Sequence, residues 1–590
     1  MNYLHQNVNS EAVPPLPEEG ECAAIDEEPT PRRSFFGGRK KAVLASVFVS
    51  STIAVAAAIA SSAKRPTRSS RETGLERSSS AAINTVDATR PSSGQRASTP
   101  ATTTSKPTSR KPATKPGTRG PTRVPTRRKP MREPTRKPAR KPTTASAAAS
   151  SSSSAAAAVP TQACNLSDES RAWLQPDFCA RVYTSELSTP RGLHIGDGDE
   201  ILLVERGKSR VVRLDDGGTK VVPVASAPGL SHGIELSGGY LYASTPTTVY
   251  RWRYRTGQTA LGTAQAAQRV IVGMDRYASG ELGAPDGHST RTLAFDDVGT
   301  WLYVSIGSEG NVDADSHRAR IRRFNIATWD AARPLEFNAG EVFADGLRNE
   351  VGLAFDSFGD LWGVENSADN LYRDDLGGDV HNENPAEELN RFREAKRGQH
   401  WGYPYCWSEY CLPVARGGSG KKGAGTVWAW PSFMNATLTD AWCRTKTNKS
   451  VMSMPSHSAP LGITFFSWKD MTQGEGCSGG FPQSMDKYAF IAFHGSWNRD
   501  PPTGYKVVFV PFNSIGNPTA QPIDLFRHDG TTAAWPVPIR PVDVQFDRCG
   551  RLLVTEDGTG SVIKITYRGA FDDIYKPINT GVADGSSCLA

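Results

Sequence analysis

Basic and imidazole side chains recur in this sequence at one kind of position, the start of a short apolar run that is typical of a β-strand. They are Arg191, His232, His288 with Arg291, Arg348 with Asn349, His457, and Arg540. A single arginine in such a place usually pairs with a neighbouring carboxylate, and a single buried histidine is usually just hydrogen-bonded. Their recurrence at one structural position instead indicates a site for a small polyanion.

Polar groups also follow the second apolar run of most of these units. They are Glu205-Arg206, Ser308-Glu309, Glu365-Asn366, His494 and Glu556-Asp557. An apolar hairpin such as residues 287–311 is therefore flanked at both ends by groups suited to chemistry. We expect these groups to line a common funnel.

The elements that must position these residues form a repeat. Six segments, which begin at Pro190, Ser231, Ser289, Asn349, Ala459 and Arg540, each hold a short apolar strand, a turn and a second apolar strand. Alternation and β-branched residues argue for strands. Residues 161–590 are therefore predicted to form an all-β, six-bladed propeller whose innermost strands start at one rim. The longest interval between units holds an expected insertion over residues 373–458.

The N-terminal region predicts a membrane segment. Residues 42–63, AVLASVFVSSTIAVAAAIASSA, carry no charge and are long enough to span a bilayer. We expect a transmembrane signal anchor after a short cytoplasmic tail over residues 1–41. Two alternatives stay open, because ASSA resembles a signal-peptide cleavage site and Arg32-Arg33 resembles a twin-arginine signal. All three place the C-terminal part across a membrane, either tethered as an extracellular domain or secreted.

Residues 64–160 have the composition of a disordered linker. They contain 21 Lys and Arg, 4 acidic residues and 13 Pro, with mainly Ser, Thr and Ala between them. Such a segment cannot bury enough apolar surface to offset its ordering entropy. One interpretation is a spacer that can carry O-glycans. The other is a cationic segment that binds an anionic cell-wall polymer. The linker has a larger positive charge than the whole chain, whose net charge is +7. Residues 161–590 are therefore net acidic, which argues against nucleic-acid binding.

The cysteines indicate an oxidising compartment. One of the nine, Cys22, precedes the membrane segment, and the other eight follow it. An even number beyond an export segment predicts disulfides. We expect Cys164–Cys179 and Cys406–Cys411 as local pairs, with the other connectivity open. Without a CxxC motif, a bound zinc or covalent haem is not expected. Sequons at Asn165, Asn435 and Asn448 fit a glycoprotein.

Three motifs, GHSTRTLAF, GLRNEVGLAFDSFGDLWGVEN and GQHWGYPYCW, resemble the soluble quinoprotein sugar dehydrogenases. These are six-bladed propellers that bind pyrroloquinoline quinone (PQQ) and calcium. Within that family the sequence is most similar to fungal PQQ-dependent pyranose dehydrogenases and the sorbosone dehydrogenase group. The resemblance covers about residues 180–570.

The resemblance implies the catalytic residues. His288 matches the general base, and Arg348 with Asn349 matches the Arg-Asn pair that holds the quinone. A neutral imidazole can take the sugar hydroxyl proton, and Arg348 would stabilise charge that develops on the quinone oxygen. Two departures from the bacterial glucose enzymes, Gly287 in place of Asp and Val351 in place of Gln, favour the pyranose dehydrogenase arm.

The resemblance also implies the cofactor shell. Several arginines can pair bidentately with the three carboxylates of PQQ. The expected cofactor-binding residues are Arg206, His232, Arg348, Asn349, His494 and Arg540. Calcium prefers oxygen ligands, including backbone carbonyls, and the resemblance places it at Ser367 and Ala368.

The sequence therefore predicts PQQ- and calcium-dependent oxidation of an aldose or related pyranose by hydride transfer to the quinone. Two alternatives belong to other classes. A metal-dependent propeller lactonase would need carboxylates around a divalent ion at the axis, where this sequence has Arg and His. A non-catalytic propeller that binds glycans or proteins has no need of the basic ring or of His288.

Overall fold

The structure of the protein is a computed structural model that describes Cys164, Leu166, residues 172–275, 287–315, 317–472, 476–529, Trp535, residues 539–578 and Cys588. The chain divides into two units, Met1–Thr143 and Thr144–Ala590, and every described residue belongs to the second. The predicted tail, membrane segment and linker, residues 1–41, 42–63 and 64–160, lie outside the described residues. Within the described ranges, no helix is long and apolar enough to cross a membrane.

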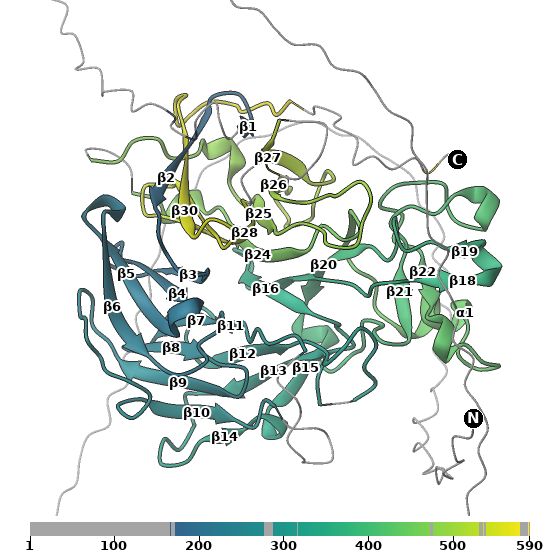
Figure 1. Ribbon diagram of the computed structural model, residues 1–590, viewed down its shortest axis with the longest axis horizontal. Coiled ribbons are helices and arrows are strands. Elements are labelled where there is room, and N and C mark those ends of the chain that lie inside the picture. Colours follow the sequence, from purple (N-terminus) through teal and green to yellow (C-terminus); the bar gives the residue numbers. More distant parts are fainter. Residues whose placement is uncertain are drawn as a thin grey trace, which may run out of the picture. The chain divides into compact units, whose positions relative to one another are not determined.

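Six antiparallel blades build the described unit, which confirms the predicted propeller (Figure 1). From the inside outwards, the first three blades are β3 (Pro190–Ile195), β4 (Ile201–Glu205), β5 (Arg210–Asp215) and β6 (Lys220–Ser226); β7 (Ile234–Ser237), β8 (Tyr240–Ser244), β9 (Thr248–Arg253) and β10 (Gln268–Val272); and β11 (Leu293–Phe295), β12 (Trp301–Ile306), β13 (Arg320–Asn325) and β15 (Glu341–Asp345). A short strand, β14 (Leu335–Glu336), adds in parallel to β10.

The remaining blades follow the same plan. They are β16 (Glu350–Phe355), β17 (Leu361–Glu365), β20 (Glu387–Phe392) and β23 (Met452–Met454); β24 (Pro460–Phe465), β25 (Ala489–Phe493), β26 (Lys506–Val510) and β27 (Ile523–His528), with β1 (Ala172–Leu174) outside it; and β28 (Pro541–Phe546), β29 (Leu552–Glu556), β30 (Ser561–Tyr567) and β2 (Phe178–Thr184). The innermost strands contact one another in the ring order β3, β7, β11, β16, β24, β28 and back to β3.

The ring closes through a strand that the repeat pattern did not reveal. β2 comes before the first blade in the chain but pairs antiparallel with β30 as the outermost strand of the last blade. The N- and C-terminal parts of the propeller are thereby held in one sheet. A strand borrowed from the other end of the chain carries no signal of its own in a search for consecutive repeats.

The core lies in apolar layers between neighbouring blades. Six clusters of buried residues each combine side chains from two adjacent blades. Second strands such as β4 and β25 are buried along their whole length because both faces of a blade are covered. This explains why these strands are continuous apolar runs rather than alternating ones.

The insertion in the fourth blade is interrupted, which corrects the expectation of a single block over residues 373–458. The blade strand β20 lies in the middle of that range, between the small hairpin of β18 (Tyr372–Arg373) and β19 (Gly378–Asp379) and a second subregion. The second subregion holds β21 (Cys406–Ser408), β22 (Val427–Ala429) and the helix α1 (Asp440–Lys446).

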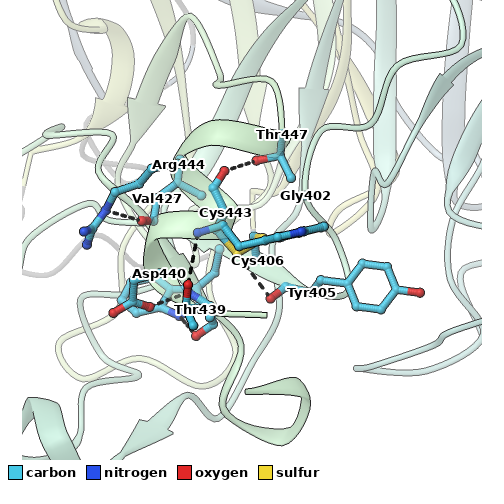
Figure 2. Close-up of a disulfide and its surroundings, with 12 residues drawn as sticks. Gly402, Tyr405, Cys406, Val427, Thr439, Asp440, Cys443, Arg444 and Thr447 are labelled. Carbon is cyan, nitrogen blue, oxygen red and sulfur yellow. Dashed lines mark hydrogen bonds between the residues drawn. A yellow bond between two sulfur atoms is a disulfide. The ribbon is translucent and has the colours of Figure 1, made fainter. Parts of the chain in front are cut away.

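Four disulfides cross-link the described residues. The predicted Cys164–Cys179 pair is confirmed, and Cys477–Cys549 is a second link. The predicted Cys406–Cys411 pair is wrong, because Cys406 bonds to Cys443 and Cys411 bonds to Cys588. Cys406 begins β21, which carries the chain away from it, and α1 brings Cys443 to a Cα–Cα distance of 5.8 Å (Figure 2). The Thr439 side chain caps α1 by accepting a hydrogen bond from the Trp442 backbone N–H.

Candidate active site

The predicted site residues fall into two groups, each centred on one carboxylate. Around Asp557 lie Arg191, Arg206, His232, His494 and Arg540, and around Asp369 lie His288, Arg348, Asn349, Ser367, Ala368 and His457. We call them the Asp557 group and the Asp369 group. The loop after β25 joins them, because His494 bonds to Asp557 and Asn498 bonds to Asp369.

His288 is held in one tautomer at the start of the third blade. Its Nδ1 lies 2.9 Å from the Ser308 carbonyl oxygen, and its backbone N–H donates to the same oxygen at 3.1 Å. A carbonyl can only accept, so Nδ1 carries the proton and the lone pair is on Nε2. Burial, followed by the positive charge of Arg348, lowers the pKa of His288 to about 4. The imidazole is therefore neutral at physiological pH and offers Nε2 as a base.

Arg348 is saturated with protein acceptors. Its Nη1 donates to the Ser367 carbonyl at 2.6 Å, and its Nη2 donates to Asp369 at 3.0 Å and to Asn311 Oδ1 at 3.1 Å. The backbone N–H of Arg348 donates to Glu365 Oε1 at 2.6 Å. The buried guanidinium is thus held in one orientation within the Asp369 group.

Asn349 follows Arg348 into the innermost strand, as the Arg-Asn motif predicts. Its side chain is buried, and its backbone carbonyl accepts a hydrogen bond from the Asn366 N–H at 3.0 Å. Gly307 makes room for it, since a Cβ at that position would lie 2.5 Å from Asn349 Oδ1 and 2.6 Å from the Cβ of His288. Any larger residue at 307 would push apart the two side chains that the motif brings together.

The Asp557 group contains cations and imidazoles with unused hydrogen-bonding atoms. Arg191 donates to Asp557 at 2.7 Å, yet its Nε is buried without a hydrogen-bond partner among the described residues. His232 Nδ1 is likewise buried and unpartnered, and burial with the charges of Arg191 and Arg206 lowers the pKa of His232 to about 3. Both nitrogens lie close to arginine charges, in surroundings that suit a negatively charged ligand.

Arg206 and Arg540 lack carboxylate partners. Within the described part of the chain, neither forms a salt bridge, and Arg206 is exposed. Arg540 is held by carbonyls alone, with Nε donating to His494 at 3.2 Å and Nη2 to Gly495 at 3.0 Å, beside the ring of Tyr505. Both cations are therefore available to a negatively charged ligand.

The glutamates that end three second strands have another role. Glu205, Glu365 and Glu556 each accept the backbone N–H of a residue at a blade start, namely Ser188, Arg348 and Arg540. None of them forms a described salt bridge with the side chain of Arg206, Arg348 or Arg540. They fix the backbone at the rim and leave the guanidinium groups to other partners.

Asp557 itself is strongly acidic. Burial acts to raise its pKa, but the hydrogen bond and charge of His494 and the charge of Arg191 outweigh burial and hold the pKa at about 2. Burial in turn is the main cause that lowers the pKa of His494. The carboxylate is therefore ionised and fixes the positions of two basic side chains from different blades.

The carbonyl of Ser367 already faces a cation. Because Arg348 Nη1 lies 2.6 Å from it, a calcium ion at the Ser367 oxygen would lie beside a guanidinium in this conformation, and Ala368 beside it is buried. Among the described residues, no group of three or more His, Cys, Asp or Glu side chains is placed to hold a metal. The calcium site at these two residues stays a prediction.

Two residues of the Asp369 group were missed in the sequence. Asp369 accepts hydrogen bonds from Arg348 and, at 2.9 Å, from Asn498, and it lies 3.5 Å from His457. Asn311 Oδ1 accepts from both the Arg348 side chain and the Asp369 backbone N–H. Asp369 comes directly after the predicted Ser367-Ala368 pair, which is the only signal that could have indicated it. Asn311 lies in a loop with no pattern of its own.

A row of buried carboxylates lies behind the Asp369 group. Glu350, Glu365 and Glu388 stand opposite one another on β16, β17 and β20, and Glu387 accepts the Ser367 backbone N–H at 2.7 Å. None of these four has a described salt-bridge partner, and burial is the first cause that raises the pKa of each, to about 7 for Glu387 and Glu388. The row therefore holds protons near neutral pH.

With this geometry in place, comparison with known proteins identifies the family. A family model described as TrAA12-like matches residues 172–568. The chain belongs to the TrAA12-like family. This TrAA12-like domain is 32% identical over 342 residues to a pyrroloquinoline quinone-dependent pyranose dehydrogenase of Coprinopsis cinerea, which covers 55% of the chain and 43% of that enzyme. The chain thus spans less than half the length of that relative.

Two further matches support the assignment. A pyrroloquinoline quinone-dependent sugar dehydrogenase of Hypocrea jecorina is 31% identical over 417 residues, covering 65% of the TrAA12-like chain and 86% of that protein. The holo form of the pyranose dehydrogenase PQQ domain from Coprinopsis cinerea superposes with a TM-score of 0.56 at 28% identity, over 67% of this chain and 97% of that one. The predicted resemblance to PQQ-dependent sugar dehydrogenases is confirmed.

Proposed function

We propose that this TrAA12-like domain oxidises a pyranose or related aldose with PQQ as its cofactor. The observation that carries the proposal is the set of cations without carboxylate partners beside a neutral histidine whose Nε2 is unprotonated. The named activities of the two sugar-oxidising relatives support it. A polyanion such as PQQ could pair with Arg206 and Arg540, which have no described carboxylate partners.

The chemistry of the proposal divides between the chain and the cofactor. When bound, PQQ supplies the acceptor for the hydride that leaves the sugar carbon. His288 Nε2 accepts the proton of the sugar hydroxyl, and the Ser308 carbonyl stabilises the resulting imidazolium through Nδ1–H. Arg348, held by Asp369 and Asn311, keeps a fixed positive charge close to His288 and keeps the imidazole neutral before reaction.

We propose calcium as a separate requirement. Calcium at the Ser367 and Ala368 carbonyls would compete with the positive charge of Arg348, whose Nη1 donates to the Ser367 oxygen. Calcium titrated into the protein without PQQ should therefore bind weakly, and PQQ should strengthen that binding by engaging Arg348. Calcium affinity that is unchanged by PQQ, measured by calorimetry, would contradict this competition.

The sequence features outside the described residues complete the proposal. Residues 42–63 would tether an exported domain, residues 64–160 would space it from the membrane and contact an anionic cell-wall polymer, and an external cytochrome or quinone would accept the electrons. Four disulfides in the described part fit an oxidising compartment. Protease protection of residues 161–590 in sealed vesicles tests the orientation.

The activity itself is tested by reconstitution. The full chain is loaded with PQQ and calcium, and the visible spectrum of the quinone is followed while candidate pyranoses are added one at a time. The proposal predicts bleaching with at least one sugar, and only in the loaded protein. No bleaching with any aldose, although PQQ is bound, would refute it.

A further inference from the structure

Trp497 departs from the rule that the other tryptophans of this chain follow. All thirteen tryptophans lie among the described residues, and Trp497 is the only exposed one, at 75%. Isolated exposed apolar side chains are common and need no explanation. Trp497 differs because of its place, between the residues that bond to the two central carboxylates of the candidate site.

The loop that carries Trp497 is braced on both sides. His494 bonds to Asp557 at 2.7 Å, and Asn498 bonds to Asp369 at 2.9 Å. Within the loop, Ser496 exchanges hydrogen bonds with Thr503 at 2.9 Å in each direction. The residues around Trp497 are therefore held by hydrogen bonds to the two central carboxylates and across the loop.

A second anchor ties the same loop to the insertion of the fourth blade. Arg499 bonds to Glu383 at 2.8 Å and to the carbonyl of Asn382, and its side chain is fully buried. Asp500 and Asn382 also exchange hydrogen bonds, at 2.9 Å and 2.7 Å. Ser496, Asn498 and Arg499 are thus held by hydrogen bonds, while the side chain of Trp497 between them is exposed to solvent.

A rigid loop that presents one indole beside a sugar-oxidising site has a specific use. The apolar C–H face of a pyranose stacks on an aromatic ring, and an indole offers the largest such surface at little cost in conformational entropy. We propose that Trp497 is the platform on which the sugar ring rests, and that it selects pyranoses with a continuous apolar face. This inference rests on the proposed function and names the residue that recognises its substrate class.

The experiment compares Trp497→Ala with the wild-type holoenzyme. Loss of the stacking surface should raise the KM for the oxidised pyranose about tenfold and leave kcat at saturation unchanged. PQQ affinity and melting temperature should not change, because the indole is exposed. Trp497→Phe, which keeps a smaller ring, should give an intermediate KM. Phe358→Ala is the matched control, since Phe358 is 48% exposed but lies in the β16–β17 turn, at the opposite end of the blades.

A second readout does not depend on turnover. Sugar is titrated into the enzyme loaded with reduced cofactor, where no reaction occurs, and tryptophan emission is recorded. The wild type should show a saturable change that Trp497→Ala lacks. An active wild type whose Trp497→Ala variant keeps the same KM and the same emission change would overturn the inference. A rate defect seen only with a protein electron acceptor would also overturn it. An inactive wild type would refute the proposed function instead.

Discussion

The Asp557 group and the Asp369 group are built from the same residue types but differ in how completely their donors are used. In the Asp369 group, Arg348 donates to the backbone carbonyls of Asn311, Asn366 and Ser367 and to the side chains of Asn311 and Asp369. In the Asp557 group, Arg206 and Arg540 have no described carboxylate partner, and Arg191 and His232 carry orphaned nitrogens. Arg348 is held by acceptors of the chain, whereas Arg206 and Arg540 are available to a negatively charged ligand, as the proposed function requires.

Similar side chains around the propeller axis can therefore have different roles, because their hydrogen-bonding partners differ. Cations without carboxylate partners suit a negatively charged ligand, whereas a guanidinium that is hydrogen-bonded within the chain suits the positioning of its neighbours. We therefore assign anchoring of the cofactor carboxylates mainly to the Asp557 group. In the proposed reaction, the Asp369 group would hold His288, the expected base, in place. Each of the following changes tests one side of that division.

The largest effect is expected at the base. His288→Ala should lower turnover roughly 10²- to 10⁴-fold, the usual contribution of a positioned general base. PQQ affinity should be almost unchanged, because the anchoring cations lie in the other group. Steady-state kinetics beside a PQQ titration give both numbers. Turnover within tenfold of wild type would remove His288 from the mechanism.

Arg348→Ala should act on stability as well as on activity. It removes one donor each from the Asp369 carboxylate, Asn311 Oδ1 and the Ser367 carbonyl, and loss of a buried charge-assisted pair costs about 3–5 kcal/mol. The melting temperature of the cofactor-free protein should fall clearly, by calorimetry. Arg206→Ala is the control, since Arg206 is exposed and its loss should leave the melting temperature where it was. Equal melting temperatures for the two variants would contradict the different structural roles of the Asp369 group and the Asp557 group.

The buried glutamates predict a pH-dependent stability. Burial raises the pKa of Glu388 to about 7, above its ordinary value of 4.5. The folded state therefore holds a proton that the unfolded state releases, so the free energy of unfolding falls as pH rises from about 4.5 to 7. In Glu388→Gln the free energy of unfolding should depend less on pH. The variant should therefore gain ~1–3 kcal/mol of stability over the wild type when the pH is changed from 5 to 8. Denaturant unfolding at each pH gives this free energy. If its pH dependence is the same in the variant and the wild type, Glu388 is ionised over the whole range.

The sequence predicted much of the fold because the propeller repeats itself. The six apolar hairpins fall on innermost strands and their neighbours, since alternation and turn residues act locally. The outermost strands were harder to predict: β2 completes the last blade from the other end of the chain, and Cys411 bonds to Cys588, 177 positions away. Long-range pairings of this kind leave no local pattern.

The candidate site was predicted in its residues but not in its partners. His288, Arg348 and Arg540 lie at blade starts, as their positions relative to the strands imply. Their hydrogen-bonding partners depend on loops that meet only in the folded chain. Asp369 and Asn311, which occupy Arg348, are examples, and so is the Ser308 carbonyl that sets the tautomer of His288.

The most direct test of the account is an equilibrium titration of PQQ into the wild type and into Arg206→Ala and Arg540→Ala. Each arginine would supply a charge-assisted hydrogen bond to a PQQ carboxylate, worth about 1.5–3 kcal/mol. Affinity should therefore fall roughly 10- to 100-fold at each site, while the melting temperature of the cofactor-free protein stays unchanged. Wild-type affinity in both variants would contradict the assignment of the Asp557 group to cofactor binding, and with it the quinoprotein function proposed for this domain.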